Sequence, residues 1–232
     1  MNADIVVRTL ELLENKEKAE ISAGFFKTGK REYAEGDVFL GISVAALRKI
    51  AKQYQTLPFS EILLLLQDKI HECRLVAVLI LVEKFKSSDS LQQREIVDFY
   101  LKNTTHINNW DLVDLSADKI IGNYFFDKDK KILHQLAKSN SLWERRIAIV
   151  STFYFIKNNK FNETLKIAEL LLHDKHDLIH KAVGWMLREV GKKNKTVEGE
   201  FLKKHYKIMP RTMLRYAIEK FPEKERKQYL KK

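Results

Sequence analysis

Helix-breaking residues are scarce in this chain. Among 232 residues there are 8 glycines and 3 prolines, whereas Leu, Ile, Lys, Glu and Ala are abundant. An all-β sandwich needs far more turn residues, so the composition favours helices joined by short polar loops. Apolar residues recur with the helical period of about 3.6 along nearly the whole chain. The sequence therefore predicts an all-α protein.

The breaks between the expected helices are short and mostly polar. Ser43 and Ser60 stand where N-caps belong. The segment Gly29–Gly41 is expected to cross the surface as a loop, and the chain after Pro222 is expected to fray. The expected helices span Ala3–Asn15, Lys18–Phe26, Val44–Tyr54, Ser60–Asp68, Glu72–Phe85, Leu91–Lys102, Asn109–Phe125, Lys128–Ala137, Leu142–Asn158, Asn162–His173, Leu178–Lys192, Glu198–His205 and Arg211–Phe221.

A degenerate repeat runs through the chain. Four segments open polar and continue as apolar helices, and superposing them makes Arg74, Trp110, Arg146 and Ala182 equivalent, at steps of 36 residues. Helix pairs of about this period are typical of HEAT-like and TPR-like solenoids, in which each repeat packs on its neighbours. We therefore expect one domain, residues 1–232, folded as a right-handed α-α superhelix of HEAT-like helical repeats, an α-solenoid.

Equivalent positions of a solenoid line up along one face. Trp110 and Arg146 are then expected in adjacent inner helices, and Asp114 lies one turn after Trp110 on the same side. Trp185, three residues after Ala182, is expected on that side too. Two tryptophans, one carboxylate and one arginine would converge on a concave surface.

The net charge of +11 predicts an anionic partner. From Asp174 to the end, 17 Lys and Arg face 8 Asp and Glu, so this segment carries +9 of the total. A lysine-rich soluble protein without any nucleic acid partner is the alternative.

Cysteine and histidine usage limits the other classes. The single cysteine, Cys73, cannot form an internal disulfide, which favours a reducing cytoplasm. The longest apolar run, Leu75 to Val82, is too short to cross a bilayer. The first residues, MNADIVVRTL, lack the basic-then-apolar layout expected of a secretory signal. The seven histidines are scattered and form no zinc motif, so they are expected at the surface or at helix caps.

Three segments in particular resemble the DNA alkylation repair glycosylases of the AlkD type. They are INNWDLVD (Ile107–Asp114), LWERRIAI (Leu142–Ile149) and KAVGWMLREVGK (Lys181–Lys192), and EGDVFLGISVAALRKIAK is similar to the family's amino-terminal loop and helix. The resemblance runs in order from about residue 20 to 220, and the segment Lys27–Gly36 departs from it.

The resemblance implies a function and a set of site residues. It implies an α-solenoid that embraces double-stranded DNA and excises cationic alkylated purines, such as 3-methyladenine and 7-methylguanine, in base excision repair. It implies no metal and no cofactor. The active-site residues would be Trp110, Asp114, Arg146 and Trp185. The DNA-binding residues would be Arg146, Arg188, Lys192, Arg211 and Arg215.

The chemistry suits so small a site. A cationic purine is already a good leaving group, so the oxocarbenium-like deoxyribose is what needs stabilising. Asp114 would supply the anion and position the water. Trp110 and Trp185 would pack on the sugar, and Arg146 would hold a phosphate.

Each of these roles has a structural alternative. The tryptophans could be core residues, and Asp114 with Arg146 could be an ion pair between repeats. Asp111 is expected to point elsewhere, and Asp118 is expected to be at most a supporting charge. No lysine has the apolar setting of a Schiff-base nucleophile, which predicts a monofunctional hydrolase of the N-glycosyl bond.

Two other functions stay open. The chain could be a non-catalytic HEAT-like protein that binds damaged or branched DNA, or a protein-binding scaffold. We expect a monomer in the cytoplasm, associated with the nucleoid, with no membrane and no obligate protein partner.

Overall fold

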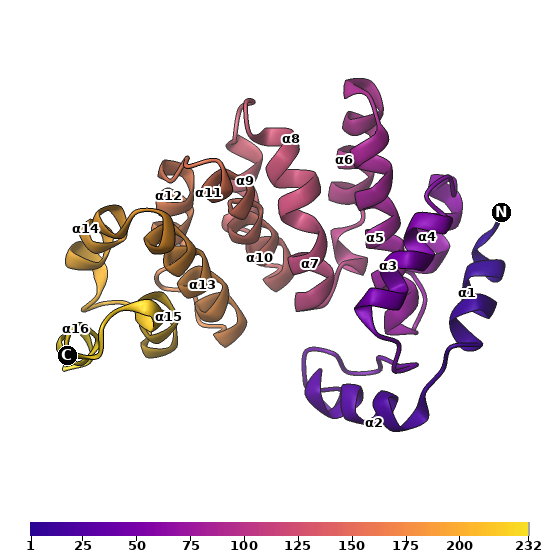
Figure 1. Ribbon diagram of the computed structural model, residues 1–232, viewed down its shortest axis with the longest axis horizontal. Coiled ribbons are helices and arrows are strands. Elements are labelled where there is room, and N and C mark those ends of the chain that lie inside the picture. Colours follow the sequence, from indigo (N-terminus) through magenta and orange to yellow (C-terminus); the bar gives the residue numbers. More distant parts are fainter. Residues whose placement is uncertain (232) are drawn as a thin grey trace. The chain divides into compact units, whose positions relative to one another are not determined.

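The computed structural model describes residues 1–231 and divides into two compact units, Met1–Ser116 and Ala117–Lys232. Each unit is built of helices, and the one element of β pairing among the described residues is a single bridge between Val38 and Ile70. The predicted all-α class is confirmed (Figure 1).

The first unit has the following helices: α1 (Ala3–Glu11), α2 (Lys16–Phe25), α3 (Val44–Gln53), α4 (Phe59–Leu66), α5 (His71–Ser87), α6 (Ser90–Lys102), the short 3₁₀ helix η1 (Thr104–His106) and α7 (Trp110–Ala117), whose last residue begins the second unit. Its centre is α5, which is apolar around its whole circumference between Leu75 and Val82 and buried there. A helix without a polar face has to be covered on all sides, and α1, α3, α4 and α6 pack on it.

The second unit continues with the π-helix η2 (Asp118–Gly122), α8 (Asn123–Phe125), α9 (Lys131–Ala137), α10 (Leu142–Ser151), α11 (Phe153–Lys157), α12 (Asn162–Leu170), α13 (Asp177–Lys193), α14 (Lys195–His205), α15 (Arg211–Ala217), the 3₁₀ helix η3 (Ile218–Lys220) and α16 (Glu223–Leu230). Helix α13 contacts α10, α12, α14 and α15. Its buried residues, among them Ala182, Val183 and Met186, form the centre of this unit's core.

Local sequence sets the starts of these helices. The N-cap prediction is confirmed at Ser43, whose hydroxyl accepts the Ala46 N–H, and is wrong at Ser60. There the helix begins one residue earlier, with Pro58 at the N-cap position. Pro210 and Pro222 likewise stand directly before α15 and α16. Proline lacks an N–H, and helix starts are where that N–H is not needed.

Most predicted helices are confirmed with bounds shifted by a few residues. Two predicted helices and one further segment differ in kind. The run from Asn109 to Phe125 contains the π-turn η2, and the run from Leu142 to Asn158 is interrupted at Thr152. The segment after Pro222, expected to fray, forms the helix α16.

The predicted loop is confirmed between α2 and α3, but only part of it lies on the surface, since Phe39 and Leu40 near its carboxyl end are each 7% exposed. Glu72 at the start of α5 accepts hydrogen bonds from the backbone N–H groups of Leu40, Gly41 and Ile42, at 2.9, 2.8 and 3.3 Å. Gly41 has φ +76°, and a Cβ there would lie 2.5 Å from the backbone nitrogen of Ala19 in α2. Only glycine fits this close approach. The loop is thereby fixed to both α5 and α2.

Candidate active site

Trp110 begins α7 and is partly exposed. The Asn109 side chain accepts its backbone N–H at 2.8 Å. Its indole stacks on Phe26, with ring centroids 5.1 Å apart and planes 10° from parallel, and meets Phe25 edge-on at 5.9 Å. Both phenylalanines lie at the carboxyl end of α2. The indole is therefore held by the amino-terminal helix as well as by its own.

The stack continues from Phe26 into the interior of the first unit. Phe26 stacks on Phe39 at 5.0 Å, and Phe39 stacks on the imidazole of His71 at 4.6 Å. We call these four residues, Trp110, Phe26, Phe39 and His71, the aromatic column. It runs from a partly exposed indole to an imidazole of which 2% is exposed. The expectation that the histidines lie at the surface or at caps is wrong for His71, although His176 does cap α13.

Charged groups surround the buried end of the column. His71 Nε2 donates to Asp111 Oδ2 at 2.7 Å, and its Nδ1 lies 3.6 Å from Asp37 Oδ2. Arg74 pairs with Asp37 at 2.7 Å. We call Asp37, His71, Arg74 and Asp111 the His71 cluster. Asp111 does point away from the indole, as expected, and its partner is this buried imidazole.

The cluster shifts the pKa values of His71 and Asp37. Burial alone would lower the pKa of His71, but its hydrogen bond to Asp111 and the nearby Asp37 carboxylate outweigh it and raise that pKa above the ordinary value. Burial alone would raise the pKa of Asp37, but His71 and Arg74 outweigh it and lower that pKa. Both shifts favour the charged forms, an imidazolium between two carboxylates.

Asp114 lies one turn beyond Trp110 in α7 and is also partly exposed. The spacing of four residues puts the two side chains on one side of the helix. Leu112 and Val113 between them are fully buried. The structure therefore brings Trp110 and Asp114 to the same side of α7, as the sequence predicted.

Asp118, considered as a supporting charge, has a structural role. Its carboxylate is 2% exposed and pairs with Lys119 at 2.8 Å and with Lys157 at 2.7 Å. Both lysines belong to the second unit, as does Asp118 itself. Its charge is therefore balanced inside that unit.

Arg146 and Trp185 lie in the second unit, on the adjacent helices α10 and α13. Arg146 is buried, and its guanidinium donates to the carbonyl of Leu178 at 2.6 Å. Trp185 is partly exposed and contacts Phe153 with ring centroids 5.6 Å apart. The structure therefore places Trp110 and Asp114 in the first unit and Arg146 and Trp185 in the second. The convergence of all four residues on one surface stays a prediction.

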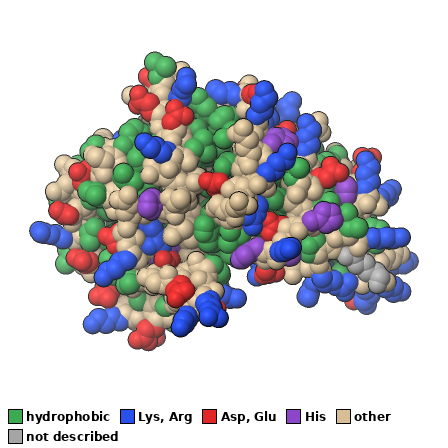
Figure 2. Space-filling view, turned by 180° about the vertical axis from the view of Figure 1, so that it is seen from behind, with side chains coloured by type: hydrophobic (Ala, Val, Ile, Leu, Met, Phe, Trp, Pro, Cys, Tyr) green, Lys and Arg blue, Asp and Glu red, His purple; other side chains and the backbone are tan. Residues whose placement is uncertain are grey.

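The other residues predicted to bind DNA lie on α13 and α15, where Lys and Arg side chains crowd the carboxy-terminal helices at the right of Figure 2. Arg188 pairs with Glu189 at 3.3 Å and also with Glu219. Lys192 pairs with Glu189 at 2.7 Å, and Arg211 donates to the carbonyl of Leu230 at 2.7 Å. Arg215 is exposed and has no ion-pair partner within residues 1–231. Within residues 1–231, no carboxylate pairs with Arg215 in place of a phosphate.

Sequence reasoning missed Phe25, Phe26, Phe39 and His71. Phe39 lies in the segment EGDVFLGISV that resembles the family's amino-terminal loop, so its position was a usable signal. The pair Phe25–Phe26 ends a helix that buries no residue of its own. An apolar pair on such a helix indicates a contact supplied from elsewhere in the fold, here Trp110.

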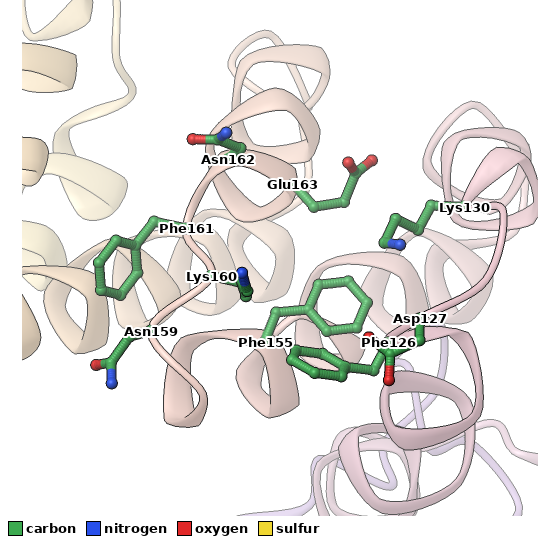
Figure 3. A pocket seen from close by; sticks show the side chains of 9 residues that line it. All are labelled: Phe126, Asp127, Lys130, Phe155, Asn159, Lys160, Phe161, Asn162 and Glu163. Carbon is green, nitrogen blue, oxygen red and sulfur yellow. The ribbon is translucent and has the colours of Figure 1, made fainter.

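A separate hollow of about 440 Å³ lies in the second unit and is lined by Phe126, Phe155 and Phe161 with charged groups at its edge (Figure 3). None of the predicted site residues lines it. Within the described part of the chain, no group of three or more His, Cys, Asp or Glu side chains is placed to hold a metal ion. Nor does that part contain a helix long and apolar enough to span a membrane.

Solved structures similar to this chain identify its fold. A "predicted DNA alkylation repair enzyme" of Enterococcus faecalis superposes with a TM-score of 0.71 at 18% identity, over 90% of this chain and 97% of that one. AlkD2 of Streptococcus mutans superposes with a TM-score of 0.55 at 20% identity, over 95% and 98% of the two chains. The fold is therefore the all-α helical-repeat fold of the AlkD type, and the predicted fold class is confirmed.

The sequence itself gives the family. The model of the DNA alkylation repair enzyme family matches residues 6–221. The protein belongs to the DNA alkylation repair enzyme family. No curated protein sequence matches the chain. The resemblance inferred from INNWDLVD, LWERRIAI and KAVGWMLREVGK is confirmed at the level of the family.

Proposed function

We propose that the protein is a monofunctional DNA glycosylase that excises cationic alkylated purines, including 3-methyladenine and 7-methylguanine, from double-stranded DNA. One observation carries the proposal: a chain of this repair family holds a partly exposed tryptophan and a partly exposed aspartate, Trp110 and Asp114, one turn apart on the same helix. An electron-rich ring beside an anion is the pair of groups that a developing sugar cation needs.

In the proposed reaction the bond between C1′ and the purine nitrogen breaks, and its electron pair neutralises the positive charge of the departing base. The deoxyribose then carries cationic character at C1′ and O4′. The Asp114 carboxylate stabilises that charge and accepts a proton from the water whose oxygen bonds to C1′. No metal, cofactor or lysine nucleophile enters these steps.

Trp110 and Trp185 would contact the sugar and the neighbouring backbone. The column beneath Trp110 supports this role, because a ring stacked on Phe26 at 10° from parallel presents a rigid face. Arg188, Lys192, Arg211 and Arg215 would neutralise phosphates, supported by the net charge of +11. Arg146, whose guanidinium also donates to the Leu178 carbonyl, would contact a phosphate. We further propose that the protein acts as a monomer on the nucleoid.

The test is single-turnover release of 7-methylguanine and 3-methyladenine from a defined duplex, with wild type beside Asp114→Asn. Asparagine keeps the shape of the side chain and removes the charge, so we expect release to fall by about 100-fold or more. Asp98→Asn, on an exposed carboxylate of α6 in the same unit, is the matched control and should release base like wild type.

The alternative function has its own outcome in this experiment. A non-catalytic binder of damaged or branched DNA would bind the alkylated duplex tightly and release neither base. That result, from a folded wild-type protein, would overturn the glycosylase proposal. Binding that persists in Asp114→Asn while release is lost would support it.

A further inference from the structure

The His71 cluster joins three segments that are distant in the sequence. Asp37 comes from the loop before α3, His71 and Arg74 from the first turn of α5, and Asp111 from the first turn of α7. Asn109 adds a contact from its side-chain nitrogen to Asp37 Oδ2 at 3.4 Å. The cluster therefore fixes where α7 begins relative to α5 and the loop.

Burying these charges is an expensive way to build a core. Each ion taken out of water loses hydration worth several kcal/mol, and a well-packed apolar group of similar volume is often at least as stabilising. His71 is 2% exposed and Arg74 4%. What charged groups do better than apolar ones is hold a single geometry, because each hydrogen bond has a direction.

His71 reaches Trp110 by two routes. The first is the backbone: Nε2 holds the carboxylate of Asp111 at 2.7 Å, and Asp111 is the residue that follows Trp110. The second is the aromatic column. The imidazole stacks on Phe39 at 4.6 Å and lies 4.9 Å from Phe26, which in turn is the ring that stacks on the indole.

The two routes constrain different motions. Anchoring Asp111 fixes the start of α7 and so the position of the Trp110 Cα. Stacking through Phe39 and Phe26 fixes the plane of the indole, because a tilt of Trp110 opens a gap against Phe26. Position and plane together define where the exposed face of the ring lies.

We propose that His71 is a positioning residue for the reaction: through Asp111 and through the Phe39–Phe26 stack it holds the Trp110 indole where it meets the deoxyribose of the alkylated nucleotide. This inference rests on the proposed glycosylase function for its catalytic part. The geometric part, that His71 sets the orientation of Trp110, stands independently of it.

The catalytic part is tested by a double-mutant cycle on single-turnover base release, using wild type, His71→Gln, Trp110→Ala and the double variant. Small displacements of a positioning group are costly, so we expect His71→Gln to slow release by about 10-fold or more. In the Trp110→Ala background the same substitution should cause no further loss. Losses that multiply in the double variant would show that His71 acts independently of Trp110 and would overturn the inference.

Tyr100→Phe is the matched control for general loosening of the first unit. It removes a buried hydrogen bond of 2.8 Å between the Tyr100 hydroxyl on α6 and Ser116 on α7. Neither residue belongs to the column or the cluster. Release should stay within about two-fold of wild type. Should His71→Gln fail to fold, Asp111→Ala replaces it, because alanine removes the acceptor that His71 Nε2 holds, and the expected result is the same.

The geometric part is tested by fluorescence of a protein whose only tryptophan is Trp110, made with Trp143→Phe and Trp185→Phe. We expect His71→Gln to raise the acrylamide quenching constant of Trp110 measurably and to change its near-ultraviolet circular dichroism, while Tyr100→Phe changes neither. Identical spectra and quenching would overturn the inference even if wild type releases base. A wild type that releases no base would overturn the proposed function alone, and the fluorescence would still decide the positioning.

Discussion

Glu198 of α14 packs its carboxylate directly against Gly191 of α13, in the space that a side chain at residue 191 would fill. The carboxylate is 1% exposed, and its Oε1 has no hydrogen-bond partner within residues 1–231. Burial raises the pKa of Glu198 to about 8, against a small opposing effect of Lys195. A neutral carboxylic acid therefore joins the two helices at neutral pH.

This pKa gives the folded protein a pH-dependent stability. Between pH 4.5 and about 8 the folded state keeps the proton that the unfolded state releases, so the free energy of unfolding falls as pH rises, by at most about 1.4 kcal/mol per pH unit. Glu198→Gln should remove that slope and stabilise the protein at pH 8. Urea unfolding at pH 5, 6.5 and 8 measures it, with Glu200→Gln on the exposed side of α14 as control. Parallel slopes in wild type and Glu198→Gln would contradict the assignment.

Gly184 lets α15 approach α13. A Cβ at residue 184 would lie 2.5 Å from the carbonyl oxygen of Met213 and 2.5 Å from the Cβ of Tyr216. Gly184→Ala has to push α15 outward, and we expect a loss of about 1–3 kcal/mol in the free energy of unfolding. Gly199→Ala is the matched control, because nothing lies within 4 Å of a Cβ there, and it should be neutral or stabilising by up to ~1 kcal/mol. Equal effects of the two substitutions would show that α15 is not held by this contact.

Much of the helical framework could be predicted because its causes are local. The serine cap at Ser43 and the prolines before α4 and α15 act within one turn of the chain. The helix α16 after Pro222 was not predicted. The spacing that puts Trp110 and Asp114 on one side of α7 is likewise a property of a single helix. The interruption at Thr152 was not predictable from apolar spacing, since that pattern continues through it.

The environment of the site residues could not be predicted, because it depends on partners far away in the sequence. His71 is separated by 40 residues from Asp111, and an isolated histidine before an apolar helix carries no sign of that carboxylate. Arg146 was expected to face DNA, yet its guanidinium meets the Leu178 carbonyl, 32 residues away. Every residue has a backbone carbonyl, so the residue type at position 178 does not indicate that its carbonyl accepts a hydrogen bond from Arg146.

Cys73 gives a probe of opening in the first unit. Its side chain is fully buried in α5, and burial, with the nearby carboxylates, raises the pKa of the thiol. We expect alkylation of the native protein to be slower than that of the urea-unfolded chain by at least ~1,000-fold, since the thiol reacts only when α5 is uncovered. Mass spectrometry after timed iodoacetamide treatment measures both rates. Rapid labelling of the native protein would mean that α5 opens without global unfolding.

Arg215 and Arg188 differ in their ion pairs, so substitutions at the two sites should change DNA binding in opposite directions. Arg215 is exposed without an ion-pair partner among residues 1–231, so Arg215→Gln should lower the slope of log K against log salt by about 0.9, the value of one phosphate contact. Arg188 is held by both Glu189 and Glu219. Glu219→Gln should remove one of these two ion pairs, together with one negative charge, and raise affinity for undamaged duplex at low salt. Fluorescence anisotropy between about 50 and 200 mM salt measures both variants. Arg94→Gln on α6, where Arg94 pairs with Asp98 at 3.8 Å, is the control and should leave the slope unchanged. A steep salt dependence that survives Arg215→Gln intact, together with no gain from Glu219→Gln, would place the phosphate contacts elsewhere than on α13 and α15.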